Sequence, residues 1–152
     1  MQFTMNVNGV ALIDRELLAL ETRAHDLLPA FEAIAELFAE GERQQFDSEG
    51  AWGSGAWSPL SPAYAVRKHA QYPGTKILER TGDLKRSLTE RPFGVELISP
   101  FSMVVGTNIS YAHFHQDGTS RMPRRPPLAM PPQQRVAITK VLQRYVRVGS
   151  LT

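Results

Sequence analysis

Residues 13–45 read IDRELLALETRAHDLLPAFEAIAELFAEGERQQ, a pattern in which apolar side chains return at intervals of three and four. This spacing places them on one face of a helix. The apolar positions are Leu17, Leu20, Ala24, Leu27, Phe31, Ile34 and Phe38. Pro29 cannot donate a hydrogen bond inside such a helix, yet the pattern keeps its phase across it. We therefore predict a long N-terminal helix over residues 13–45 that is kinked, or briefly broken with Pro29 opening a second helix.

The apolar face of this helix admits two interpretations. It can pack against the core of its own chain, or it can form a coiled-coil seam with another subunit. The pattern is short for a coiled coil, and Pro29 interrupts it. Both features favour ordinary core packing.

The remainder of the chain predicts short helices around one hairpin. The expected elements are a strand over residues 2–8, helices over 62–70, 81 or 83 to 89 and 133–148, a short helix or turn over 108–116, and a hairpin over 95–105 that turns at Ser99-Pro100. In the last helix, Val136, Val141, Leu142 and Tyr145 should face inward. The fold class is therefore α+β: a small antiparallel sheet packed against the long kinked N-terminal helix and shorter helices, with a C-terminal helix.

Residues 47–60 contain three glycines among several serines, so we expect a mobile loop there. The loop carries Trp52 and Trp57. These large side chains either pack onto the body and pin the loop there, or stay exposed until a partner protein buries them.

Residues 119–132 contain five prolines and three arginines, which predicts an extended arm. Within the arm, residues 127–130 could form an edge strand, where missing N–H donors do least harm. Arg121, Arg124 and Arg125 would then reach a neighbouring subunit. Together with Trp52 and Trp57, these arginines make up the candidate subunit or partner interface.

The length of 152 residues fits one domain spanning 1–152. The chain has no cysteine, so disulfides, thiolate metal sites and cysteine nucleophiles are excluded. No apolar run approaches the roughly twenty residues that a membrane helix needs, and no secretory signal is visible. We expect synthesis in the cytoplasm and no membrane partner.

The chain carries no pattern typical of an enzyme. His113 and His115 lie two residues apart, but only Asp117 is near them as a further metal ligand. Glu79, Asp83 and Glu90 lie among basic residues, which favours surface ion pairs. Serine-hydrolase elbows, phosphate-binding loops and dinucleotide fingerprints are absent. We therefore predict neither catalysis nor a metal nor another cofactor.

Charge is distributed unevenly along the chain. Residues 1–50 hold ten acidic and three basic residues, whereas residues 51–152 hold five acidic and fourteen basic ones. Such asymmetry can mark a face that contacts nucleic acid, or complementary surfaces through which copies of one protein dock head to tail. It can also reflect solvated helix faces that contact nothing. Non-specific contact with DNA is therefore one alternative function.

Five short phrases occur in a defined order through the middle of the chain. They are Trp57-Ser-Pro-Leu-Ser61, Ile77-Leu-x-x-Thr-Gly-x-Leu-x-x-Ser87, Val105-Gly-Thr-Asn108, Tyr111-Ala-x-x-His-Gln-x-Gly118 and Pro123-x-Arg-Pro126. Each phrase alone is weak, but the five in order resemble the phage virion morphogenesis family, whose members include tail-completion proteins of contractile-tailed phages. The closing phrase is similar to that of neck proteins from long-tailed phages. Pro127-Leu128 departs from the pattern, in which an aromatic residue precedes the leucine.

The resemblance implies a structural protein of a phage or prophage that acts in tail completion and head–tail joining. It implies a subunit of a ring or collar at the tail end or neck of the virion. The expected partners are further copies of the chain and tail-tube, tail-terminator or neck proteins. The family has no catalytic residues to carry over.

Several residues of the five phrases are expected to support the fold, for physical reasons that their residue types give. Thr81 and Gly82 should form the turn that caps the next helix. Tyr111 and Ala112 should pack a short segment onto the sheet, and Gly118 allows a backbone conformation that other residues resist. The full set of scaffold candidates is Thr81, Gly82, Leu84, Tyr111, Ala112, His115, Gly118 and Pro126.

Overall fold

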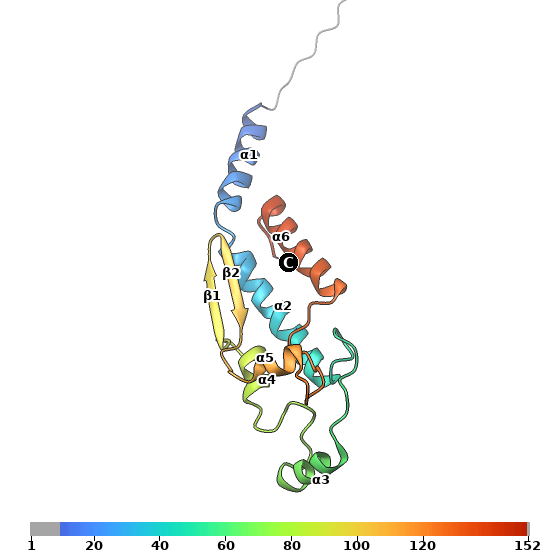
Figure 1. Ribbon diagram of the computed structural model, residues 1–152. Coiled ribbons are helices and arrows are strands. Elements are labelled where there is room, and N and C mark those ends of the chain that lie inside the picture. The colour runs from blue at the N-terminus through green and yellow to red at the C-terminus, as the bar shows by residue number, and fades with distance from the viewer. Residues whose placement is uncertain (1–9, 152) are drawn as a thin grey trace, which may run out of the picture.

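The computed structural model describes residues 10–151 of the chain (Figure 1). This range forms six helices and one two-stranded antiparallel sheet. The elements are α1 (Val10–Ala24), α2 (Leu28–Asp47), α3 (Pro62–Gln71), α4 (Asp83–Thr89), β1 (Val95–Ser99), β2 (Ser102–Gly106), α5 (Ala112–Asp117) and α6 (Pro132–Val148). The predicted α+β class is confirmed. The strand predicted over residues 2–8 lies outside the described residues.

The N-terminal helical pattern forms two helices. α1 ends at Ala24, and α2 begins at Leu28, so the broken form of the prediction is confirmed. Pro29 lies in the first turn of α2, where its missing N–H has no intrahelical partner to lose. The backbone N–H of Leu27 donates instead to the carbonyl of Pro100 in the hairpin turn, at 3.0 Å. The break therefore joins the helical pair to the sheet.

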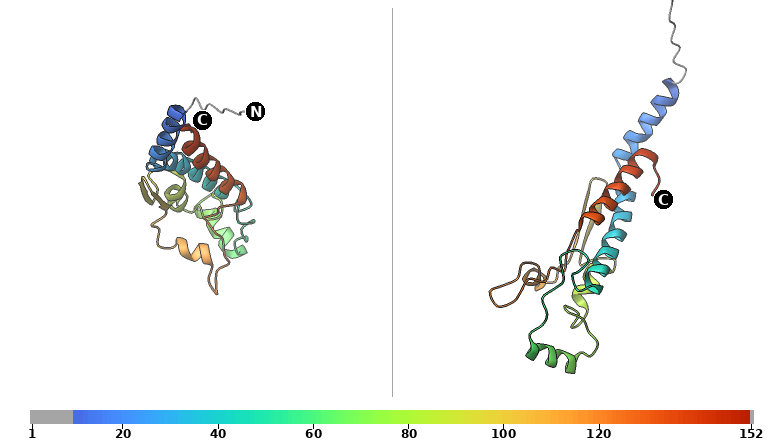
Figure 2. Two further views of the ribbon diagram at one scale, coloured as in Figure 1. Left: turned by 90° about the horizontal axis from the view of Figure 1, so that it is seen from above. Right: turned by 90° about the vertical axis from the view of Figure 1, so that its right-hand side faces the viewer.

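α2 is the central element of the fold. It contacts α4, α6 and both strands, and the hairpin and α6 lie on opposite sides of it (Figures 1 and 2). The core around it consists of Ala35, Phe38, Ala39, Phe46, Trp57, Leu84, Leu88, Phe93 and Ala112. Core packing is thus confirmed for the α2 half of the apolar pattern. The α1 half differs, because Leu17 remains 59% exposed.

The hairpin pairs Val95 with Gly106 and Ser99 with Ser102, so its turn consists of Pro100 and Phe101. Ile98, Met103 and Val105 pack against the core from this sheet. The predicted hairpin is confirmed in position, but its turn lies one residue later than the predicted Ser99-Pro100, because Ser99 still pairs with Ser102.

The described chain is elongated, with α1 at one end and α3 at the other (Figure 2). α1 contacts α6 near its C-terminal end. There the Arg23 guanidinium donates to the carbonyls of Val146 and Arg147, at 2.8 and 3.1 Å. These carbonyls belong to the last turn of α6, where cationic donors are favourable. Among residues 10–151, no helix combines the length and hydropathy that crossing a bilayer requires.

α6 confirms the predicted C-terminal helix, but not every residue predicted to face inward does so. Val136 is 52% exposed, and the buried residue of this turn is Gln134. The Gln134 amide donates to the carbonyl of Leu37 at 3.2 Å. Gly41 makes this approach possible, since a Cβ there would lie 2.2 Å from the Gln134 amide nitrogen. Close helix contact through glycine, rather than the apolar period alone, sets the rotation of α6.

Opposite charges are partly matched within the chain. Arg91 forms ion pairs with Glu32, Glu36 and Glu96, which joins the loop after α4 to both α2 and β1. Lys85 bridges Asp47 and Glu79 at 2.9 and 3.0 Å. Several acids of α2 therefore find their partners in the same chain.

Glu42 is a fully buried carboxyl group in the middle of this packing. Its Oε1 accepts a 3.4 Å hydrogen bond from the backbone N–H of Ala129, and its Oε2 has no partner within the described residues. Burial disfavours the charged form and raises the pKa of Glu42 from 4.5 to about 8. The folded chain accordingly holds this carboxyl group neutral at pH 7.

Glu42→Gln is expected to make folding stability less sensitive to pH between about 4.5 and 8. In the unfolded chain Glu42 loses its proton near pH 4.5, whereas in the folded chain it does so near pH 8. The wild type therefore loses stability as pH rises through this window, by about 1.4 kcal/mol per pH unit. The variant should gain stability relative to wild type over the window and level off above it, as measured by urea unfolding.

The control is Glu90→Gln, which alters an exposed carboxylate. It should leave the pH profile of the unfolding free energy as it is in the wild type. A constant difference between Glu42→Gln and wild type from pH 5 to 9 contradicts the neutral assignment of Glu42.

Candidate functional site

A cleft of about 550 Å³ lies near the α3 end of the molecule. Three segments line it: residues 60–68, residues 78–81 and residues 111–125. Its apolar surface comes from Leu60, Leu78, Tyr111, Phe114 and Met122. Its charged residues are Lys68, Arg80, Arg121 and Arg125, and no acidic residue lines it. The cleft therefore combines an apolar surface with positive charge.

The carbonyl oxygen of Pro126 holds the segments behind the cleft together. It accepts a hydrogen bond from Trp57 Nε1 at 3.1 Å and another from Gln45 Nε2 at 2.9 Å. These donors come from the 47–60 segment and from α2. One carbonyl thus joins three parts of the chain that are distant in sequence.

Trp57 is only 6% exposed, and its ring packs edge-to-face on Phe46 with 5.5 Å between ring centroids. The predicted partner contact is wrong for this residue, and the alternative that it pins the loop is confirmed. The loop has further ties, since Gln45 also bonds Gly53 and Ser54. The predicted mobile loop over 47–60 is accordingly corrected to a segment fastened to α2.

Trp52 is half-buried and packs beside α2. A Cβ placed on Gly41 would come within 2.8 Å of its ring, which shows how closely the indole approaches the helix. Part of Trp52 remains accessible.

The three arginines of the predicted arm have different environments. Arg125 is 5% exposed, and its guanidinium donates to the carbonyls of Ser58 and Pro59 at 2.7 and 2.9 Å. Burial lowers the pKa of Arg125. Arg124 is exposed but donates to the carbonyl of Gln116 at 2.8 Å. Arg121 is exposed, and its side chain has no partner among residues 10–151.

The predicted projecting arm over 119–132 is therefore only partly correct. Residues 125–127 are buried and, with the residues that follow, form a strap across the body. The predicted strand over 127–130 is wrong, because the N–H and carbonyl of Leu128 both bond the side chain of Gln116, at 3.2 Å. The projecting part comprises α5 and the turn that follows it (Figure 2).

Gly118 shapes this projecting turn. Its φ of +77° lies in the left-handed region, and a Cβ there would lie 3.0 Å from the backbone nitrogen of Arg124. Thr119 and Met122 then form a short antiparallel bridge. The predicted backbone role of Gly118 is confirmed, and the turn brings Arg121 and Met122 to the rim of the cleft.

The scaffold candidates before α4 lie at its start. Gly82 occupies the N-cap position with a φ of 79°. The Thr81 hydroxyl donates to the Asp83 carboxylate at 2.6 Å. Leu84 and Ala112 are buried in the core, which fits their place among the scaffold candidates. Tyr111 differs from its prediction, since it is 41% exposed and lines the cleft instead of packing onto the sheet.

His115 faces the cleft from α5 and lies in edge contact with Tyr111. Its Nδ1 is buried without a hydrogen-bond partner in the described chain. Burial, followed by the nearby Arg125 charge, lowers the pKa of His115. The ring is therefore neutral at pH 7. In the described range no three His, Cys, Asp or Glu side chains gather as a metal site would require.

The positive charges of the cleft divide into two kinds. Lys68 is buried, donates to the carbonyls of Thr75 and Lys76, and has a pKa lowered by burial. Lys68 and Arg125 thus serve the fold. Arg80 and Arg121 are exposed, and their side chains make no hydrogen bond or ion pair within 10–151. These two guanidinium groups are free to meet a partner.

Four of the five sequence phrases contribute lining residues to the cleft: those that contain Leu60, Thr81, Tyr111 and Pro123. Sequence reasoning did not single out the lining residues Tyr64, Lys68, Arg80, Phe114 and Met122. Nothing in the sequence indicated that α3 would stand opposite the phrases containing Thr81 and Tyr111.

A second charged feature lies on α6. Lys140, Arg144 and Arg147 recur at helical spacing and are exposed. None of them forms an ion pair within the described chain. They make a basic stripe, which we define as these three residues.

The fold and the cleft define a protein that offers binding surfaces on a small helical scaffold. Comparison with family models identifies the family of this protein. The chain belongs to the phage virion morphogenesis family, whose model matches residues 9–147. Searches of curated proteins and of solved structures found no match. Family membership assigns the protein to the assembly of phage particles and associates it with the virion.

Arg125→Ala is expected to destabilise the fold, whereas Arg121→Ala is not. The first change removes a side chain that is only 5% exposed and leaves the carbonyls of Ser58 and Pro59 without their charged donor, which should lower the unfolding free energy by about 2–3 kcal/mol. The second removes an unpartnered surface group and should change it by less than about 0.5 kcal/mol. Urea unfolding followed by circular dichroism measures both. Equal effects would contradict the division between structural and free arginines.

Proposed function

We propose that this protein acts in tail completion and head–tail joining, as a subunit of a ring or collar at the tail end or neck of the virion. The match of the virion morphogenesis family to residues 9–147 is the observation that carries this proposal. The proposed partners are further copies of the chain and tail-tube, tail-terminator or neck proteins. The protein acts by binding, and no catalytic role is proposed.

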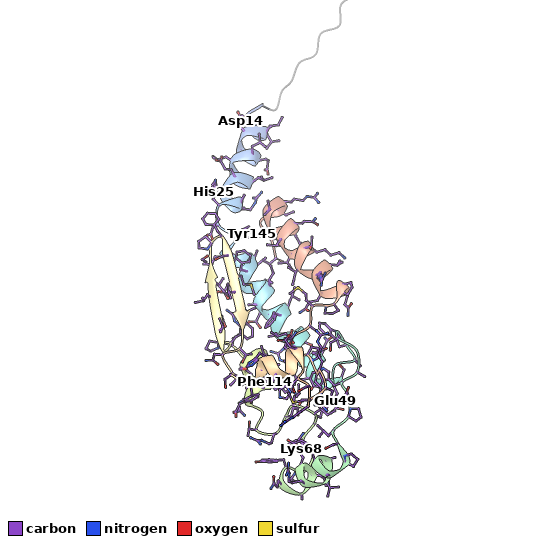
Figure 3. The ribbon with its side chains drawn as sticks, viewed as in Figure 1. Asp14, His25, Glu49, Lys68, Phe114 and Tyr145 are labelled. Atoms are coloured by element: carbon purple, nitrogen blue, oxygen red, sulfur yellow. The ribbon has the colours of Figure 1, made fainter. Side chains whose placement is uncertain are left out.

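The shape of the chain supports a ring. Its two ends differ in chemistry: α1 presents exposed leucines at one end, and the positively charged cleft lies near the other (Figure 3). Unlike surfaces on opposite ends favour heterologous, head-to-tail contacts. Such contacts close into a ring when the rotation between neighbours permits it.

An early stop codon in this reading frame is expected to block particle completion. Electron microscopy of the lysate should show full heads beside detached or abnormal tails, because the joint between them lacks a component. A synonymous change at the same codon serves as the control. Supplying the wild-type protein from a plasmid should restore joined particles. Normal infectious particles from the stop-codon phage would overturn the proposal.

The basic stripe on α6 favours a second candidate function, non-specific contact with DNA. Its three cations stand at helical spacing without ion-pair partners in the described chain. Such a surface attracts phosphate through counterion release, without reading the base sequence. A protein at the joint through which DNA passes could use this contact together with its assembly role.

Arg144→Glu is expected to weaken duplex binding if the stripe contacts DNA. Fluorescence anisotropy with a random-sequence duplex should show an affinity that falls steeply as salt rises. The variant should bind less tightly at low salt, with a salt slope smaller by about one unit. Arg15→Glu on α1 is the matched control. Failure of the wild type to bind at low salt would remove this candidate.

A further inference from the structure

α1 exposes an apolar stripe that nothing in the described chain covers. Ile13, Leu17 and Leu20 recur at spacings of four and three, and they are 54%, 59% and 40% exposed. α1 stays attached mainly through Arg23, near its last turn. Figure 1 shows the rest of the helix extending beyond the body. An exposed stripe of this kind is typical of a surface that a partner covers.

Unpaired acids flank the stripe. Asp14 and Glu21 lie on one side and Glu16 on the other, at 100° of rotation per residue. All three are exposed, and their side chains form no ion pair or hydrogen bond within 10–151. Arg15 lies on the opposite side of the helix from the stripe. The surface of α1 that carries the stripe is thus apolar at its centre and negative at its edges.

The cleft has the complementary pattern. Its apolar surface includes Tyr111, Phe114 and Met122, and its free charges are the guanidinium groups of Arg80 and Arg121. The cleft contains no acidic lining residue that could neutralise them. An apolar helix face with acidic edges would bury its leucines there and place its carboxylates near the two arginines.

One chain cannot make this contact with itself. Figure 3 places Asp14 of α1 and Lys68 of the cleft at opposite ends of the molecule. If copies of this chain cover both surfaces, the apolar stripe of one copy must therefore contact the cleft of a different copy. The same pair of surfaces would then repeat from each copy to the next.

The exposed apolar surface of the hairpin fits the cleft less well. Leu97, Phe101 and Val104 are exposed on the hairpin. The neighbouring carboxylate, Glu96, is already paired with Arg91. The carboxylate within the strand is therefore not free, and α1, with three unpaired acids beside its apolar stripe, is the better match in charge.

We propose that α1 of one copy docks into the cleft of the next copy, between α3 and the α5 turn. This proposal rests on the proposed ring and deepens it by naming the two surfaces that meet. The contact is heterologous, so each subunit gives one helix and receives one. Closure of the series produces the ring.

Engineered disulfides test the docking directly, because the natural chain has no cysteine. Leu17→Cys and Met122→Cys are made as separate single variants, mixed and oxidised. The expected product is a disulfide-linked dimer containing one chain of each variant, seen on non-reducing gels and confirmed by mass spectrometry. The control mixture pairs Leu17→Cys with Leu97→Cys, an exposed hairpin position. The cleft mixture should give several-fold more mixed dimer than the control.

Two results would overturn the docking. One is equal mixed-dimer yield, including none, from the cleft and control mixtures. The other is predominant dimerisation of Leu17→Cys with itself, which would mean that α1 pairs with α1. Light scattering of the wild type at the same concentration shows whether copies associate at all. Microscopy of the stop-codon lysate tests the assembly role independently, so failure of the docking is distinguishable from failure of the proposed function.

Charge reversal tests the electrostatic part of the same contact. Arg80→Glu combined with Arg121→Glu in the Met122→Cys chain should reduce the mixed dimer several-fold at low salt. Adding Glu16→Arg and Glu21→Arg to the Leu17→Cys chain should restore it. Circular dichroism verifies that each variant is folded. If neither charge reversal changes the yield of mixed dimer, the assignment of these charges is overturned.

Discussion

The backbone carbonyl of Pro126 is the point on which the arrangement of the molecule depends. It accepts from Trp57 and from Gln45, and thereby ties the strap and the 47–60 segment to α2. Both donors are buried, so each would lose a hydrogen bond that water could not replace. The neighbouring Arg125 adds two more bonds to this junction. The walls of the cleft take their positions from it.

This junction also divides the charges by role. Arg125 is buried and donates to the carbonyls of Ser58 and Pro59, so it is part of the scaffold, whereas Arg80 and Arg121 remain available. The same division holds for acids, since those of α2 partly pair with Arg91 while those of α1 do not. The unpaired acids of α1 and the unpaired arginines of the cleft thus lie near opposite ends of an elongated chain. A protein of virion assembly can use such polarity to join like subunits.

The sequence predicted the elements well because their signals are local. The break before Pro29, the turn at Pro100 and the cap at Gly82 each follow from the conformations that a few neighbouring residues allow. The predictions failed where burial decided the outcome. Arginine is usually a surface residue, so Arg125 was expected to be exposed, and the helical period placed Val136 on the inward face. Contacts with distant segments instead determined the environment of both residues.

Sequence alone determined the fold class, most element positions and, through five ordered phrases, the family. These depend on helical period, turn chemistry and recurring motifs, which adjacent residues carry. Only the tertiary structure decided which of Trp52, Trp57 and the three arginines are buried, and that α3 faces the α5 turn across a cleft. The physical reason is separation along the chain: Trp57 and Pro126 are 69 residues apart, and no local pattern specifies that they meet.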